Sequence, residues 1–465
     1  MADAAPRILE LAEHALSTPF PLRVRAWDGS EAGPSGAPVL VFARRKALRR
    51  LLWRPGELGL ARAWVAGDLD IEGDLYQALD LLAELLWERP EPGPAHGTAE
   101  SVRKAAAALR DPVTYRLARS ALALSGPGLP PAPPPEEVRR RAGSAHTRRR
   151  DKVAVSHHYD VGNDFYEMVL GPSMVYSCAV WPDFTGDPLD GTGAAAVPGG
   201  GADAGPGAVP TSLGDAQYAK LDLVCRKLQL QPGHRLLDVG CGWGSMVLHA
   251  AEHYGVRATG ITLSGEQASY ARKRIADAGF TGQIEIRVQD YRDVRDGPYD
   301  AISSIGMAEH VGSERYLEYA RTLHALVRPG GRLLNHQIAR RPMADEEGYR
   351  VDEFIDRYVF PDGELSPVGT TVARLEEAGF EVRDVEALRE HYARTLRAWV
   401  ANLDDAWPAA VAATSEGRAR VWRLYMAACA VSFQRNRIGV NQVLAVRTPD
   451  DGASGMPATR TAWLS

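Results

Sequence analysis

The sequence predicts a doubly wound α/β domain preceded by a smaller α+β domain. From about residue 215, short apolar strands alternate with amphipathic helices, which is the pattern of a parallel sheet with helices on both faces. A glycine-rich turn follows the first of these strands. The first 125 residues lack this alternation, and a proline-dense stretch separates the two regions.

The N-terminal region, residues 1–125, mixes helices and strands. A helix is expected over 8–16, and strands are expected within 22–30 and 37–43. Leucines then recur at helical spacing over 75–86. We therefore predict a small α+β domain here.

Residues 126–150 form a linker that is first rich in proline and then basic. Its basic run, which extends over 138–152, suits either a solvated, mobile segment or a patch that meets an anionic membrane surface. The linker leads into the second domain, which we place at 151–465.

A low-complexity segment over 185–210 interrupts this second domain. Gly, Ala and Pro make up 18 of its 26 residues, so the segment cannot bury enough apolar surface to offset the entropy of ordering it. We expect a disordered insertion, and its composition favours an inert segment over a lid.

The elements of the second domain follow from hydrophobic periodicity. Helices are expected at 216–228, 244–254, 265–278 and 314–326. Strands are expected at 234–240, 256–262, 284–290, 299–305 and 331–338. The last hundred residues are expected to be largely helical.

Composition excludes several classes of protein. The 465 residues carry a formal net charge of −5, so binding of nucleic acid through bulk positive charge is not expected. The four cysteines contain no CxxC pair, so we expect no disulfide framework, zinc ribbon or other metal site. The N-terminus is unlike a signal peptide, and no apolar run reaches about 18 residues. We expect a cytoplasmic protein.

The glycine turn is the strongest sign of a cofactor. Within 235–245, Asp238 ends a strand, and Gly240, Gly242 and Gly244 follow before a helix. Such a turn lets the backbone approach a ligand closely. An acid directly before the glycines favours S-adenosylmethionine, and the next strand ends without the acidic residue that would bind the ribose of NAD.

Two further cofactor candidates, Asp290 and Tyr291, end the third strand. Together they suit an adenine ring, because one accepts a hydrogen bond and the other stacks. For Asp290 a strand-end cap is an equally good interpretation.

Six motifs between about residues 150 and 447 carry a resemblance to a known family. They are HHYDVGNDFYEMVLGPSMVYSCAVW (157–181), LLDVGCGWGS (236–245), GITLSGEQ (260–267), GMAEHVG (306–312), LLNHQI (333–338) and RYVFPDGEL (357–365). In order and spacing they resemble the cyclopropane-fatty-acyl-phospholipid synthases, which are related to the mycolic-acid cyclopropane synthases.

The resemblance implies a fold and an activity. It implies a Rossmann-like class I methyltransferase domain, and the N-terminal block resembles the family's smaller, lipid-associated domain. The implied enzyme transfers the methyl carbon of S-adenosylmethionine to a cis double bond of a phospholipid-bound acyl chain and gives a cyclopropane fatty acid.

The resemblance also implies site residues. In addition to Asp238, the positions expected to contact S-adenosylmethionine are Tyr159, Tyr176, Ser177, Gly240, Gly242, Thr262, Gln267, Asp290 and Tyr291. A bicarbonate ion is expected at the catalytic centre, where its ligands are the backbone at Cys178, the side chains of Glu309, His336 and Tyr358, and the backbone at Ile338.

The implied chemistry leaves two products open. Methyl transfer leaves a carbocation on the acyl chain, so the site must exclude water. Loss of a proton from the added methyl group closes a cyclopropane, whereas a hydride shift first gives a 10-methylene, mid-chain branched fatty acid that a partner reductase could use. Ala308 stands where the family usually has Phe, which keeps the second product open.

Two functions of other kinds compete with this interpretation. One is a small-molecule S-adenosylmethionine-dependent methyltransferase, and the other is a non-catalytic lipid-binding protein, which is disfavoured because no catalytic position of the family is lost. The resemblance implies a homodimer that visits the inner face of the membrane, where its acyl-chain substrate lies, and no nucleic acid partner.

Overall fold

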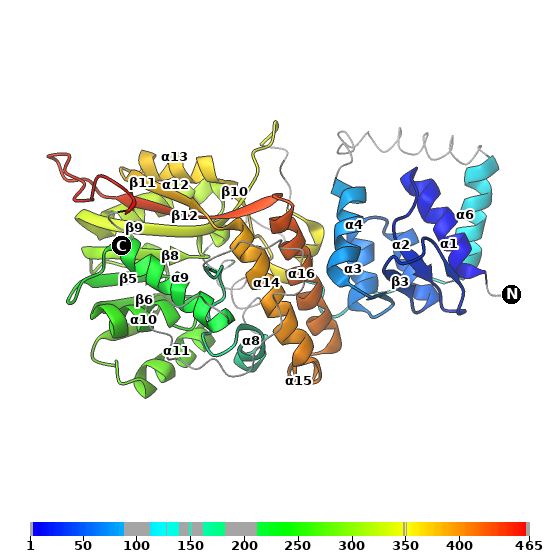
Figure 1. Cartoon of the computed structure of the whole chain (residues 1–465), viewed down its shortest axis with the longest axis horizontal. Helices are drawn as coiled ribbons and strands as arrows, with labels where there is room; N and C mark the ends of the chain where they lie inside the picture. The colour runs from blue at the N-terminus through cyan, green and yellow to red at the C-terminus, as the bar shows by residue number, and fades with distance from the viewer. Residues whose placement is uncertain are drawn as a thin grey trace. The chain divides into compact units, whose positions relative to one another are not determined.

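The computed structural model describes residues 3–87, 112–126, 128–138, 148, 150, 161–181, 212–346, 349 and 351–461 (Figure 1). The chain forms two compact units. The first comprises Met1–Arg139 with Ser415–Val431, and the second comprises Arg140–Thr414 with Ser432–Ser465. The predicted insertion at 185–210, most of the basic run and Tyr159 lie outside the described residues.

The first unit is a small α+β structure built on a four-stranded sheet. Its strands are ordered β2-β1-β3-β4, and only the β1–β3 pair is parallel. Its elements are α1 (Ala4–Leu16), β1 (Arg23–Arg25), β2 (Glu31–Ala32), β3 (Val39–Phe42), α2 (Arg45–Trp53), α3 (Glu57–Val65), β4 (Leu69–Glu72), α4 (Leu75–Trp87) and α6 (Pro112–Ser125). The predicted α+β class of this region is confirmed, while α2 and α3 were not predicted.

A segment from late in the chain belongs to the first unit. Most of helix α16 (Glu416–Gln434) packs there. The buried Arg420 donates hydrogen bonds to the backbone oxygens of Trp64 (2.7 Å) and Leu69 (2.6 Å). In return, the Trp64 indole donates to the Arg420 carbonyl at 2.9 Å. Satisfying a buried guanidinium in this way fixes the segment to the first unit.

The second unit is built on an eight-stranded sheet ordered β11-β12-β9-β8-β5-β6-β7, with β10 paired to β9. Its strands are β5 (Arg235–Val239), β6 (Arg257–Thr262), β7 (Ile284–Val288), β8 (Tyr299–Ile305), β9 (Val327–Arg340), β10 (Ser366–Pro367), β11 (Glu381–Ala387) and β12 (Ile438–Val446). All pairs are parallel except those of β12, which runs antiparallel to both neighbours. The predicted doubly wound sheet is confirmed.

Helices cover both faces of this sheet (Figure 1). Side chains of α9 (Leu213–Leu228), α10 (Ser245–Tyr254) and α11 (Gly265–Asp277) form one apolar core with the strands. Those of α12 (Tyr316–Leu326) and α13 (Val368–Glu377) form a second core. The remaining helices are α8 (Asn163–Leu170), α14 (Arg389–Asp405) and α15 (Trp407–Ala413). Every helix among the described residues is too short or too polar to cross a bilayer.

Candidate active site

The carboxyl ends of neighbouring parallel strands bring the predicted cofactor residues together. Such an edge is where ligands bind in open α/β sheets. A cavity of about 120 Å³ lies there, and it is lined by all the described cofactor candidates: Tyr176, Ser177, Asp238, Gly240, Gly242, Thr262, Gln267, Asp290 and Tyr291. The remaining candidate, Tyr159, lies outside the described residues.

The turn after β5 needs glycine. Gly240 and Gly244 have φ angles of 81° and 82°, which side chains rarely adopt. A Cβ atom on Gly240 would lie 3.3 Å from Cβ of Met307, in the loop after β8. The amides of Gly240 and Cys241 both donate to the Ile261 carbonyl, at 3.0 and 2.9 Å, so the turn is held against β6 while its backbone faces the cavity.

Polar side chains at the end of β6 are fixed by each other. The Thr262 hydroxyl donates to Gln267 Oε1 at 2.9 Å. Ser264 caps α11 by accepting from the Gln267 amide at 3.2 Å. Both of these predicted cofactor contacts, Thr262 and Gln267, are therefore held in place before a cofactor binds.

At the end of β7 the Asp290 carboxylate is already engaged. It accepts from the Arg292 amide at 2.9 Å and from the Arg292 guanidinium at 2.6 and 2.8 Å. This is the strand-end cap that the sequence left open, although Asp290 still lines the cavity. The ring of Tyr291 meets Tyr319 edge-on at 5.1 Å, and the Arg292 guanidinium lies 5.3 Å from its centroid.

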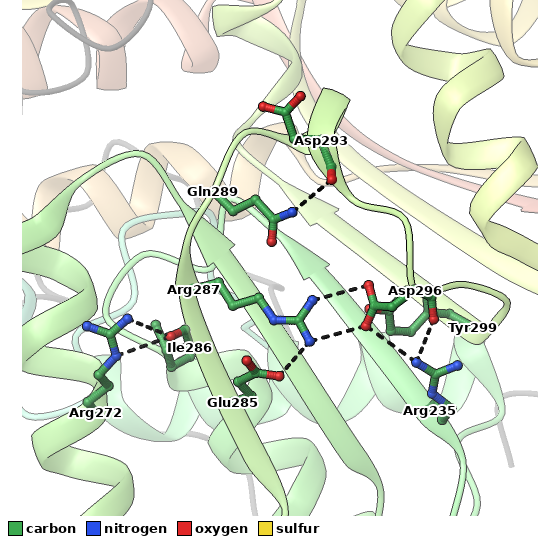
Figure 2. Close-up of polar contacts among 9 residues, drawn as sticks. All are labelled: Arg235, Arg272, Glu285, Ile286, Arg287, Gln289, Asp293, Asp296 and Tyr299. Atoms are coloured by element: carbon green, nitrogen blue, oxygen red, sulfur yellow. Dashed lines mark hydrogen bonds and ion pairs between the residues drawn. The ribbon is translucent and has the colours of Figure 1, made fainter.

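Ion pairs brace the segment that carries Asp290. Figure 2 shows Arg287 of β7 joined to Asp296 through two contacts of 3.1 Å, and also to Glu285. In the same view, the Gln289 side chain donates to the Asp293 carbonyl at 3.0 Å. These contacts close the loop after β7 on itself and hold one wall of the cavity.

Helix α9 supplies a buried lysine that sequence reasoning missed. Lys220 lines the cavity, and its Nζ donates to Ser177 Oγ at 2.9 Å. One turn earlier, Gln217 donates to the Ser177 carbonyl at 2.9 Å. Both are polar residues on the apolar stripe that Val224 and Leu228 continue, and this mismatch is the signal that could have found them.

Two buried ions at this end of the cavity have shifted pKa values. Burial lowers the pKa of Lys220 to about 8. Burial raises the pKa of Asp238 to about 6, although the Ser303 hydroxyl, which donates to it at 2.6 Å, favours the charged form.

Three of the predicted catalytic residues, Glu309, His336 and Ile338, lie close together beside this cavity. Glu309 Oε1 accepts from the Ile338 amide at 2.8 Å, so these two positions touch. His336 lies two residues before Ile338 on β9, and side chains two apart in a strand share a face. Gly306, Met307 and His310, which flank Glu309, line the cavity itself.

Three polar atoms in this group are buried without a hydrogen-bond partner among the described residues. They are Glu309 Oε2, His336 Nδ1 and His336 Nε2. Buried polar groups are normally satisfied, so unpartnered ones in a cluster indicate a ligand or water. Burial raises the pKa of Glu309 to about 7 and lowers that of His336 to about 3. A small polar anion such as bicarbonate fits this donor and acceptor set.

The other two predicted catalytic positions, Tyr358 and Cys178, are also buried in the second unit, on separate segments. Tyr358 is 1% exposed, on a π-helical turn (Ile355–Val359). The segment after it returns to the Glu309 loop, where the Glu364 amide donates to the Glu309 carbonyl at 3.1 Å. The Cys178 thiol donates to the carbonyls of Ala179 (3.1 Å) and, more distantly, Leu388 (3.5 Å).

Aromatic residues wall the cavity near the glycine turn. Tyr176 and Trp243, which line it, both contact the fully buried ring of Tyr166, at 5.7 and 4.6 Å between centroids. Tyr176 also contacts Trp399 of α14 at 5.2 Å. Side chains of this kind exclude water from the site.

Comparison with known proteins adds an independent line of argument. A sequence model described as mycolic acid cyclopropane synthetase matches residues 146–443. A probable fatty acid methyltransferase of Mycobacterium tuberculosis is 41% identical over 448 residues, which is 94% of this chain and 93% of that protein. The cyclopropane-fatty-acyl-phospholipid synthase of Escherichia coli K12 is 35% identical over 67% of this chain and 72% of its own length.

A solved structure agrees with these matches. Mycolic acid cyclopropane synthase CmaA1, complexed with SAH and CTAB, superposes with a TM-score of 0.54 at 32% identity. The match covers 63% of this chain and 98% of that chain. The α/β unit described above is therefore a methyltransferase fold.

Proposed function

Because the chain belongs to the mycolic acid cyclopropane synthetase family, we propose that it transfers the methyl carbon of S-adenosylmethionine to a cis double bond of a phospholipid acyl chain, giving a cyclopropane fatty acid. In general terms, the chain is a methyltransferase that uses S-adenosylmethionine. The observation that carries the proposal is the group of unpartnered buried atoms on Glu309 and His336 beside the cofactor cavity.

Each part of the site has a distinct task. When bound, S-adenosylmethionine supplies an electrophilic methyl carbon, and bicarbonate supplies a base for the proton that the acyl chain must lose. An alkene is a weak nucleophile, so the protein contributes alignment and a dry cavity more than activation. His336 and Tyr358, which are 2% and 1% exposed, help to exclude water that would quench the carbocation.

Glu309 and His336 suit an anion because burial disfavours the charged form of each side chain. With its pKa raised to about 7 by burial, Glu309 is largely protonated below neutral pH. It then accepts from the Ile338 amide through Oε1 and donates from Oε2. Neutral His336 offers one N–H donor and one acceptor nitrogen, which orient the anion without adding a second charge.

An exposed face of the first unit supports a lipid substrate. Leu52 and Trp53, at the end of α2, are 42% and 57% exposed. The same helix begins with the exposed cations Arg45 and Lys46. Exposed apolar and basic side chains on one helix are what an anionic bilayer surface attracts.

A second product is favoured by one residue. Ala308 is 5% exposed beside Glu309, where the family usually has the bulkier Phe. A smaller residue changes the wall near the reacting carbon, and a hydride shift before proton loss would give a 10-methylene fatty acid. The M. tuberculosis relative that aligns over 94% of this chain is named a probable fatty acid methyltransferase, a name that fits either product. A partner reductase would act on the methylene product.

The proposal is tested with methyl-labelled S-adenosylmethionine and vesicles of a mono-unsaturated phospholipid. We expect label in the released acyl chains for the wild type and for a control variant, His253→Ala, on the outer part of α10. His336→Ala should bind cofactor normally and lose nearly all label transfer. If the protein binds cofactor but no label enters the lipid, the lipid substrate is refuted. The result would then favour a small-molecule methyltransferase.

A further inference from the structure

The catalytic candidate His336 has a polar neighbour on the adjacent strand. In the antiparallel pairing of β9 with β12, His336 lies directly opposite Gln442. The side chains of such a pair point to the same face of a sheet, and their Cβ atoms lie about 4.5–5.5 Å apart. His336 and Gln442 are 2% and 0% exposed. An imidazole and an amide are therefore buried side by side, on the face of the sheet that α9 covers.

The facing ends of these two side chains have complementary hydrogen-bonding needs. Both ring nitrogens of His336 and the Nε2 group of Gln442 are buried without a hydrogen bond to any of the described residues. Leaving a buried polar group without a partner is costly. The Gln442 Nε2 group is a donor, and a neutral imidazole has one acceptor nitrogen. Each side chain can therefore supply what the other lacks.

A buried lysine decides which way the Gln442 amide points. Lys227 of α9 is 0% exposed, and its ammonium donates to Gln442 Oε1 at 2.7 Å. An ammonium group donates and cannot accept, so the amide oxygen must face Lys227 and the amide nitrogen must face away from it. To any other neighbour, Gln442 can therefore offer only a donor.

Acidic residues of the edge strand β11 hold Lys227 in turn. Its ammonium forms an ion pair with Glu386 and lies 3.7 Å from the Asp384 carboxylate. Arg460 binds the same two carboxylates, at 2.9 and 3.4 Å. The charge of Lys227 is thus balanced within the protein, and an unbroken chain of polar contacts runs from these acids through Lys227 to Gln442.

We propose that Gln442 is a positioning residue for His336: its Nε2 donates to one imidazole nitrogen, so that the other nitrogen carries the proton and donates to the bound anion. The inference rests on the proposed function in one respect, the role of His336 as a ligand of that anion. A rotation of one side chain or a single bridging water makes the contact. Lys227 strengthens the donor, because hydrogen bonds in a chain polarise one another.

The contact fixes the tautomer of an imidazole that otherwise has two. Burial, together with the charges of Lys220 and Lys227, lowers the pKa of His336 to about 3, so the ring is neutral. In a neutral imidazole, the hydrogen bond at one nitrogen decides which nitrogen carries the proton. Without Gln442, His336 could turn a lone pair toward the anion, and two acceptors would then face each other.

Two variants of Gln442 separate this role from packing. Gln442→Glu keeps the size of the side chain and its contact with Lys227, but a carboxylate held ionised by that lysine can only accept from His336. Gln442→Leu removes both hydrogen bonds. The matched control is Asn441→Asp, the same amide-to-acid change one residue earlier on β12, where the side chain points to the opposite face of the sheet.

The first readout is the nitrogen NMR spectrum of protein labelled at histidine, in buffer freed of bicarbonate. The signals of His336 are assigned by their loss in His336→Ala. We expect one tautomer for the wild type and for Asn441→Asp, the opposite tautomer for Gln442→Glu, and a mixture for Gln442→Leu. A mixture in the wild type, or the same tautomer in the wild type and both Gln442 variants, would overturn the inference.

The second readout is the dependence of label transfer on added bicarbonate. Gln442→Glu and Gln442→Leu should need about tenfold more bicarbonate for half-maximal transfer, the usual effect of losing one hydrogen bond to an anion. Their affinity for S-adenosylhomocysteine should stay the same. A role in packing alone predicts a normal bicarbonate dependence for Gln442→Glu, and that result would overturn the inference.

The two readouts distinguish failure of this inference from failure of the proposed function. The tautomer of His336 is measured without lipid and without turnover. If the wild type transfers no label to lipid at any bicarbonate concentration, the proposed function is refuted, and the nitrogen NMR spectra still decide whether Gln442 orients His336.

Discussion

Replacing Glu309 with Gln should change how stability depends on pH. Burial raises the pKa of Glu309 from 4.5 to about 7. A carboxyl group whose pKa is higher in the folded than in the unfolded state stabilises the fold below pH 4.5, and this contribution is lost as pH rises through 7. The shift corresponds to about 3 kcal/mol in total at 1.36 kcal/mol per pKa unit, and most of it falls between pH 5 and pH 8.

The assay is urea unfolding of wild type, Glu309→Gln and the exposed control Glu314→Gln at both pH values. Between pH 5 and pH 8 the wild type should lose about 2 to 3 kcal/mol more stability than Glu309→Gln, because the amide cannot ionise. Glu314→Gln should follow the wild type. If wild type and Glu309→Gln change in parallel, Glu309 titrates as a solvated acid, and its proposed role as a neutral donor to bicarbonate is refuted.

Further predictions test the other parts of the site. Gly240→Val should abolish binding of S-adenosylhomocysteine by calorimetry, since φ is 81° and a Cβ would already meet Met307 at 3.3 Å; unchanged affinity would disprove the need for glycine. The double variant Leu52→Ser, Trp53→Ser should float with anionic vesicles at least tenfold less than the wild type, while its cofactor affinity stays the same. Flotation equal to that of the wild type would show that these two residues do not make the lipid contact. Asp290→Asn should lower cofactor affinity only a few-fold, because the Asp290 carboxylate is largely engaged by Arg292. Complete loss of cofactor binding would instead identify this carboxylate as the main adenine contact.

The parallel strands from β5 to β9 could be predicted from their apolar runs, and an amphipathic helix follows β5, β6 and β8. Two strands of the C-terminal region could not. β11 (EVRDVEA) alternates charged and apolar residues, and only one side of it pairs within the sheet. β12 follows a long helix directly, and its position between β9 and β11 depends on pairing with strands far away in sequence. Local pattern does not carry such long-range information.

The candidate site was predictable to the extent that it follows strand ends and motifs. The cofactor candidates meet at one cavity because parallel strands present their carboxyl ends together. Lys220 was missed because a lysine within an amphipathic helix is usually solvated, and only packing shows that it is buried. The strand-end cap at Asp290 was left open for a related reason, since the geometry of a turn decides which neighbour a carboxylate bonds to.

The most direct test of the account is the proton NMR spectrum of acyl chains released after reaction with methyl-labelled S-adenosylmethionine and vesicles of mono-unsaturated phospholipid. Mass alone cannot serve, because the cyclopropane and the methylene product are isomers. We predict labelled, upfield cyclopropane ring protons, whereas vinylic methylene protons would identify the second product. Label that stays wholly in the cofactor, although the vesicles serve as substrate for a known synthase, would contradict the central claim that this site methylates a lipid double bond.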